Sequence, residues 1–162
     1  MLEIETLNNQ ATFAAGCFWG VEAAFRELPG VLNTTVGFTG GDWLNPSYLD
    51  VCSGMTGHVE AVQLEYDSDR ISYDRLLDVF WSIHNPTKLD REGPDKGPQY
   101  RSMIFVHSPY QEEQARASRQ RLAESGRYDR PIRTEIRPIS TFYLAADDHQ
   151  QYYEKKRASV GS

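Results

Sequence analysis

The chain has 162 residues, 40% of them hydrophobic, and a formal net charge of −6. This length suits one domain with a core that needs no disulfide or metal to hold it, so we take residues 1–162 as a single domain with flexible ends at 1–10 and 157–162. The interspersed negative charge disfavours a nucleic-acid surface, and neither a membrane span of ~20 apolar residues nor a secretion signal is visible, so we expect a cytoplasmic monomer.

The first half of the chain predicts an alternation of strands and helices. We expect strands at 11–15, 31–41 and 59–66 and helices at 18–28 and 72–84. The first helix places Phe18, Val21, Phe25 and Leu28 on one face, and Pro29-Gly30 ends it. The second carries one apolar stripe that consists of Leu76, Leu77, Phe80, Trp81 and His84.

The second half continues the mixture of strands and helices. We expect strands at 101–107 and 132–139, helices at 109–125 and 145–156, and long loops at 42–57 and 85–100. This order predicts an α+β fold, a two-layer sandwich in which helices pack on a mixed sheet. Loops of about sixteen residues are long for a compact domain and suggest functional roles.

A cysteine stands where the first strand changes to the first helix, in the segment Gly16-Cys17-Phe18-Trp19-Gly20. Free N–H groups and the helix dipole stabilise a thiolate at a helix start, so we expect the Cys17 pKa to fall below the about 8.5 of an ordinary thiol. The two glycines allow close backbone approach, and the aromatics supply apolar surface beside the nucleophile. The alternative is a structural cysteine buried among core aromatics.

A carboxyl group begins the more apolar face of the strand at 59–66. Alternation places Glu60 on one face with Val62, Leu64 and Tyr66. Such a carboxyl is either wet at the strand end or buried with a raised pKa. In the second case it could act as a general acid near neutral pH.

Two tyrosines stand in loops shaped by Gly and Pro, where their hydroxyls could bind a polar substrate. They are Tyr48 in NPSY and Tyr100 in DKGPQY, although the usual interpretation of either tyrosine taken singly is a half-buried surface residue without such a role. Cys52, in VCSG, has neither a helix start nor a cationic neighbour in sequence, so we expect it to be inert or moderately reactive.

One interpretation of a reactive Cys17 is a Cys–His hydrolase. Its possible bases are His58, His84, His107 and His149. The position of His84 on an apolar helix face favours a core histidine. No cysteine or histidine spacing is typical of a metal site.

The quoted residues closely resemble the A-type methionine sulfoxide reductase family, the peptide-methionine (S)-S-oxide reductases. GCFWG (16–20) is similar to the active-site segment of that family. Three further segments follow in family order: NPSYLDVCSGMTGHVEAV (45–62), GPDKGPQYRS (93–102) and FYLAADDHQQYYEK (142–155). The resemblance runs from about Thr12 to Lys155, nearly the whole chain.

The resemblance implies a reaction and a set of roles; the alternative without turnover is a module that binds oxidised peptides. Cys17 would attack the S epimer of methionine sulfoxide, free or in proteins, and become a sulfenic acid in a repair reaction. Glu60 would help to protonate the sulfoxide oxygen. The remaining roles are oxygen binding by Tyr48 and Tyr100, methyl binding by Phe18 and Trp19, and a pocket acid at Asp95.

The resemblance also implies no metal and no bound cofactor, only an external thiol reductant. That reductant would be thioredoxin, or glutaredoxin with glutathione, and dithiothreitol in vitro. Many family members carry resolving cysteines in a C-terminal tail, whereas no cysteine follows Cys52 here. We therefore expect an external thiol to recycle Cys17, with a Cys17–Cys52 disulfide as the less favoured route.

Overall fold

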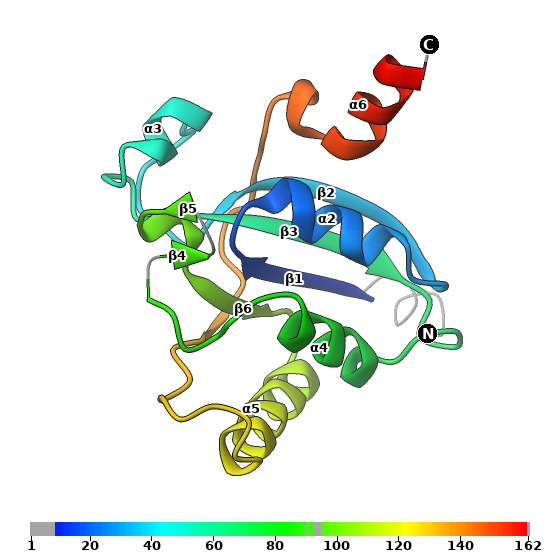
Figure 1. Cartoon of the computed structure of the whole chain (residues 1–162), viewed down its shortest axis with the longest axis vertical. Helices are drawn as coiled ribbons and strands as arrows, with labels where there is room; N and C mark the ends of the chain where they lie inside the picture. Colours follow the sequence, from blue (N-terminus) through cyan, green and yellow to red (C-terminus); the bar gives the residue numbers. More distant parts are fainter. Residues whose placement is uncertain (1–8, 90, 93–94, 162) are drawn as a thin grey trace.

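The computed structural model describes residues 9–89, 91–92 and 95–161 (Figure 1). The strands of the main sheet are β1 (Gln10–Ala15), β2 (Val31–Thr39), β3 (Val59–Tyr66), β6 (Ser102–Val106), β7 (Glu135–Pro138) and β8 (Tyr143–Leu144). The helices are α2 (Phe18–Arg26), α3 (Tyr48–Cys52), α4 (Tyr73–Ser82), α5 (Pro109–Glu124) and α6 (Tyr152–Gly161). Within this part of the chain, no helix has the length and apolar content needed to cross a membrane.

The main sheet is mixed, as the sequence predicted. Its strand order is β7-β6-β1-β3-β2-β8. The pair β6–β7 is parallel, and the other neighbours are antiparallel. Ala15, the last residue of β1, pairs with Ser102 at the start of β6, and Gly37 and Phe38 of β2 pair with β8. The α+β class is therefore confirmed.

Helices α2, α4 and α5 cover one face of this sheet and enclose the larger core (Figure 1). Phe13 of β1 stands at its centre, where its ring stacks on Phe25 of α2 at 5.1 Å and on Phe80 of α4 at 5.3 Å. The residues predicted to form the apolar faces of the helices at 18–28 and 72–84 are buried there, except Leu28, which is half-buried and packs against the same core. The opposite face holds a smaller cluster that consists of Ala14, Val59, Ala61, Met103 and Phe105, with Ile139 and Phe142 packed against it.

Both long loops contain regular structure that we did not predict. The first includes α3, whose start is fixed by a reciprocal capping box: Asp50 N donates to Ser47 Oγ, and Ser47 N donates to Asp50 Oδ2. The second contains a short hairpin, β4 (Arg91–Glu92) and β5 (Asp95–Lys96), followed by the 3-10 turn η1 (Pro98–Tyr100). The prediction of unstructured loops was therefore wrong.

The last predicted helix begins later than its sequence pattern indicated. Residues 143–144 form β8, and the turn η2 (Asp147–His149) precedes α6, which starts at Tyr152. Gln151, immediately before α6, has a φ of 50°, in the left-handed region that interrupts a helix. Helix α6 lies beside α2, on the side away from α4 and α5 (Figure 1).

Candidate active site

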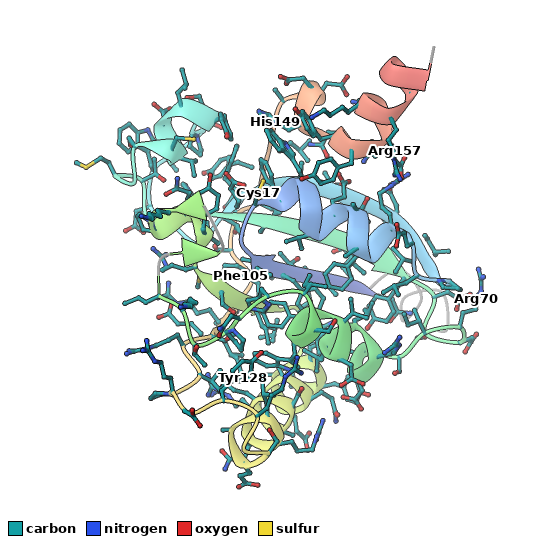
Figure 2. The ribbon with its side chains drawn as sticks, viewed as in Figure 1. Cys17, Arg70, Phe105, Tyr128, His149 and Arg157 are labelled. Carbon is teal, nitrogen blue, oxygen red and sulfur yellow. The ribbon has the colours of Figure 1, made fainter. Side chains whose placement is uncertain are left out.

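Cys17 occupies the N-cap position of α2, as the sequence predicted. Gly16 has a φ of 102°, which suits glycine and lets the chain turn sharply from β1 into the helix. Cys17 is half-buried and lies at the same end of the sheet as His149 (Figure 2). Its thiol is placed where unsatisfied N–H groups and the helix dipole favour negative charge.

Gly20 does not have the close-approach role that we expected. A Cβ added at Gly20 would meet the Tyr153 ring at 3.8 Å, an ordinary van der Waals distance. The contact between α2 and α6 at this point therefore leaves room for a small side chain.

Glu60 is buried, with 1% of its surface exposed, which excludes the alternative of a solvent-exposed carboxyl group at the strand end. Its strand β3 lies between β1 and β2, and Glu60 pairs with Phe38 of β2. Its Oε1 accepts a hydrogen bond of 3.1 Å from the Phe18 backbone N–H. The carboxyl group is therefore held at the first turn of α2, one residue from Cys17.

Two aromatic residues that follow Cys17 form an apolar wall. Phe18 is buried, and its ring lies 5.6 Å from that of Phe38 and 6.5 Å from that of Tyr48. Trp19 is half-buried and stacks on Tyr152, with the ring centroids 3.8 Å apart. The wall thus joins residues from α2, α3 and the C-terminal segment.

Tyr48 lies close to the two other groups expected to work with it. Burial is the largest cause that raises its pKa. A side-chain hydrogen bond with Cys52 and the nearby acidic groups of Cys52, Glu60 and Tyr100 act in the same direction. The hydroxyl therefore keeps its proton, as a donor must. The sequence did not indicate that Tyr48 and Cys52 would meet, because we did not predict α3, whose turn brings residues four apart together.

Tyr100 and Asp95 belong to the second long loop. Tyr100 ends η1, which contacts β3, and is half-buried. Asp95 lies in β5, but its side chain is outside the part of the chain that the structure describes. Its proposed role stays a prediction.

His149 is a member of this cluster whose role the sequence did not reveal. The Trp19 Nε1–H donates to His149 Nδ1 at 3.0 Å, and the imidazole lies 4.5 Å from the Tyr48 ring. Because an indole can only donate, a neutral His149 carries its proton on Nε2. The separation of 130 residues between the two partners explains why no local pattern indicated the contact.

The four histidines argue against a Cys–His hydrolase. Three of them are hydrogen-bonded to groups other than Cys17. His58 bonds Gly41 N and Trp43 O. His84 bonds Phe80 O and Ser102 Oγ, and His107 bonds Thr12 Oγ1. The Nδ1 lone pair of His149 accepts the Trp19 N–H and is therefore not available to take a proton from a thiol. The favoured interpretation of His84 as a core histidine is confirmed.

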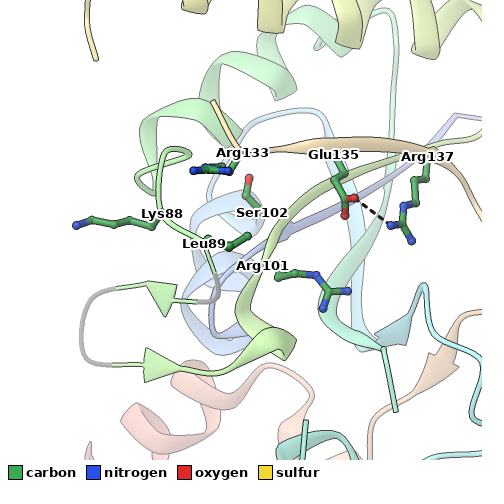
Figure 3. A pocket seen from close by; sticks show the side chains of 7 residues that line it. All are labelled: Lys88, Leu89, Arg101, Ser102, Arg133, Glu135 and Arg137. Atoms are coloured by element: carbon green, nitrogen blue, oxygen red, sulfur yellow. Dashed lines mark hydrogen bonds and ion pairs between the residues drawn. The ribbon is translucent and has the colours of Figure 1, made fainter. Parts of the chain in front are cut away.

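A separate pocket of about 490 Å³ lies at the start of β6 and β7 (Figure 3). Its described lining consists of Lys88, Leu89, Arg101, Ser102, Arg133, Glu135 and Arg137. Arg101 Nη2 donates to Gly57 O, and Arg137 pairs with Glu135 at 3.0 Å. No cysteine belongs to this described lining, so the pocket is separate from the cluster around Cys17. Among the described residues, no group of three or more His, Cys, Asp or Glu side chains could hold a metal ion.

The geometry around Cys17 suits a small group that is apolar on one side and polar on the other. The Cys17 sulfur stands at the helix start, with a buried carboxyl group and a protonated phenol near it. Aromatic rings close the apolar side. Such a site can attack an electrophilic atom while donating protons or hydrogen bonds to an adjacent oxygen.

Comparisons with known proteins agree with this chemistry. Residues 9–161 match the family model described as peptide methionine sulfoxide reductase. The peptide methionine sulfoxide reductase MsrA 1 of Nostoc sp. is 57% identical over 147 residues, 91% of this chain and 90% of the relative.

Solved structures share the fold. Methionine sulfoxide reductase A of Corynebacterium diphtheriae has a TM-score of 0.84 and 38% identity, over 92% of this chain and 75% of that chain. Mxr1 from Saccharomyces cerevisiae in complex with Trx2 has a TM-score of 0.62 and 25% identity, over 88% and 83%.

Proposed function

This chain belongs to the peptide methionine sulfoxide reductase family, and we propose that the cluster around Cys17 carries out its reaction. The protein is an oxidoreductase that returns methionine sulfoxide to methionine and so repairs oxidised proteins. The proposal assigns the individual steps of that reaction to residues of this chain.

The first step is attack of the Cys17 thiolate on the sulfoxide sulfur. That sulfur is a poor electrophile until its oxygen is protonated or strongly hydrogen-bonded, so Glu60 supplies a proton while Tyr48 and Tyr100 donate hydrogen bonds. The attack forms a bond between the two sulfur atoms. The sulfur–oxygen bond of the substrate and this new sulfur–sulfur bond then break as the protonated oxygen passes to Cys17, so that methionine leaves and Cys17 becomes a sulfenic acid. Methionine sulfur is reduced, and the cysteine sulfur is oxidised by the same two electrons.

Substrate orientation follows from the two sides of the site. Phe18 and Trp19 hold the S-methyl group, whereas the carboxyl and phenol groups hold the oxygen. When the methyl group and the oxygen are both fixed, only one configuration at sulfur points the third substituent, the carbon chain of the methionine, out of the site. We assign the S epimer to this configuration. Asp95 is proposed as a further acidic residue of this pocket.

One observation carries the proposal: the Phe18 N–H donates to the buried Glu60 carboxyl group, next to the N-cap cysteine. This contact holds a carboxyl group close to the thiol at the start of α2, which supports the proposal. Burying a carboxyl group costs free energy, and such burial is typical of carboxyl groups that transfer protons in active sites.

The test is mass spectrometry of a peptide containing either epimer of methionine sulfoxide, with dithiothreitol as reductant. We expect the S-epimer peptide to lose the mass of one oxygen atom and the R-epimer peptide to stay unchanged. Cleavage of the peptide chain would instead support a hydrolase, and an unchanged S-epimer peptide would support a binding module.

Recycling needs an external thiol, and we propose thioredoxin, or glutaredoxin with glutathione, for this role. The complex of a structural neighbour with Trx2 supports a thioredoxin-type partner. Two thiol groups then reduce the sulfenic acid to the thiol, and they leave as a disulfide with one water molecule. No prosthetic group is needed in this scheme.

A further inference from the structure

Glu22 is a buried carboxylate that the reaction does not use. It lies on α2, with 1% of its surface exposed. Its Oε1 accepts from Gln151 N at 2.8 Å. Its Oε2 accepts from Gln151 Nε2 at 2.8 Å and from Thr34 Oγ1 at 2.7 Å. Three charge-assisted hydrogen bonds at one buried group mark a strong anchor.

The anchored residue has an unusual backbone conformation. Gln151 has a φ of 50°, which costs a non-glycine residue free energy. Glu22 bonds both the backbone and the side chain of Gln151, and so offsets this cost where the chain reverses before α6. The preceding residue, Gln150, is tied separately to β2, because its amide bonds Val36 N and Val36 O.

The residues that flank this anchor both hold Trp19. His149 accepts the indole N–H at 3.0 Å, and Tyr152 stacks on the indole with 3.8 Å between centroids and an interplanar angle of 9°. The left-handed turn at Gln151 lies between these two contacts. Glu22 therefore bonds the residue that lies between the two partners of the indole.

We propose that Glu22 is a positioning residue that sets the methyl-binding wall by holding the turn at Gln151. His149 and Tyr152 transmit this constraint to Trp19. The inference rests on the proposed function, in which Trp19 contacts the substrate methyl group. Glu22 is then a determinant of substrate recognition that does not itself contact the substrate.

The test is the steady-state kinetics of Glu22→Gln with a methionine sulfoxide peptide. An amide at position 22 keeps one acceptor and turns a donor either toward the Gln151 backbone N–H or toward Gln151 Nε2 and Thr34 Oγ1. We expect KM to rise about tenfold while kcat stays within about twofold, because the reacting groups remain in place. Discrimination against an S-ethyl analogue should fall, since the wall is less rigidly placed.

The matched control is Glu154→Gln. Glu154 also links the C-terminal segment to α2, through a 2.8 Å ion pair with Arg26, but its carboxylate bonds Arg26 and not Gln151. We expect this exposed pair to change KM less than about twofold. Equal effects of the two variants would overturn the proposal.

A rescue variant separates positioning from general stability. Glycine adopts a left-handed φ with little cost, so Gln151→Gly in the Glu22→Gln background should recover much of the KM. A loss caused only by weakening α2 would not be recovered. If Glu22→Gln does not fold, Gln151→Ala should raise KM in the same direction, and an unchanged KM would overturn the inference.

A spectroscopic readout is independent of activity. The Trp19 indole N–H resonance should shift in Glu22→Gln, whereas that of Trp81, bonded to Ser118, should not. An unshifted Trp19 resonance would contradict the anchor even if the reductase chemistry is right. A shifted resonance in a protein whose Cys17→Ser variant still reduces substrate would support the anchor and contradict the proposed function.

Discussion

Glu60 shows what a single position in the sequence can and cannot reveal. Strand alternation placed it on the apolar face of β3, but alternation could not distinguish a wet strand end from a buried site. Burial depends on β1 and β2, which lie on both sides of β3, and on the start of α2. His149 was harder still, because its indole partner stands 130 residues away.

The first prediction concerns the acid at residue 60. Glu60→Gln can still donate a hydrogen bond but cannot transfer a proton, so the substrate should be reduced more slowly yet measurably. General acid catalysis is typically worth about 10²–10⁴-fold, and we expect Glu60→Ala to lose a factor in this range. Single-turnover rates with excess enzyme, measured from acid to alkaline pH, provide the check. A parental rate for Glu60→Ala at every pH would show that the carboxyl group is not the acid.

At the scale of elements, the sequence predicted those that local periodicity defines. The faces of α2 and α4 and the strands β1, β3 and β6 are placed as expected. The elements that it missed depend on tertiary contacts or on a cap. Helix α3 starts at a capping box that we did not identify, and α6 starts late because Glu22 holds Gln151 in a left-handed turn.

His84, just after α4, predicts a pH dependence of stability. Burial lowers its pKa from 6.5 to about 4, while Nδ1 donates to the Phe80 carbonyl. The unfolded chain therefore binds a proton at a pH where the folded protein does not. The stability is fully present above pH 6.5 and is lost as the pH falls toward about 4, by up to about 3 kcal/mol.

The check is urea unfolding of the parent and of His84→Gln across this pH window. The variant should be less stable at neutral pH and should lose less free energy of unfolding on acidification. The difference between the two curves isolates His84 from the carboxylates, which titrate in both proteins. Parallel curves would show that the buried imidazole does not set this dependence.

At the scale of the whole molecule, the fold brings segments far apart in sequence around one thiol. The α2 start, β3, α3, η1 and the C-terminal segment converge at one end of the sheet (Figures 1 and 2). Periodicity and order indicated a mixed sheet with helices, but not this convergence. The resemblance supplied the set of residues that composition and spacing could not gather.

Recycling is a property of the molecule and its partner together. Cys52 is exposed at the end of α3, beside the Tyr48 hydroxyl, whereas Cys17 caps α2. We predict that one equivalent of substrate, without reductant, leaves a sulfenic acid at Cys17 and a thiol at Cys52. Thiol counting and peptide mapping after trapping with a sulfenic-acid reagent provide the measurement. A quantitative Cys17–Cys52 disulfide that thioredoxin reduces rapidly would establish the internal route instead.

The most direct test of the central claim is methionine formation in a single turnover by Cys17→Ser and Cys52→Ser. Each variant is mixed with a limiting amount of the S-epimer peptide, and no reductant is added. Because only Cys17 stands at the helix start with Glu60 beside it, we predict no methionine from Cys17→Ser. Cys52→Ser should convert all of the limiting peptide to its methionine form. Full formation of methionine by Cys17→Ser would contradict the account.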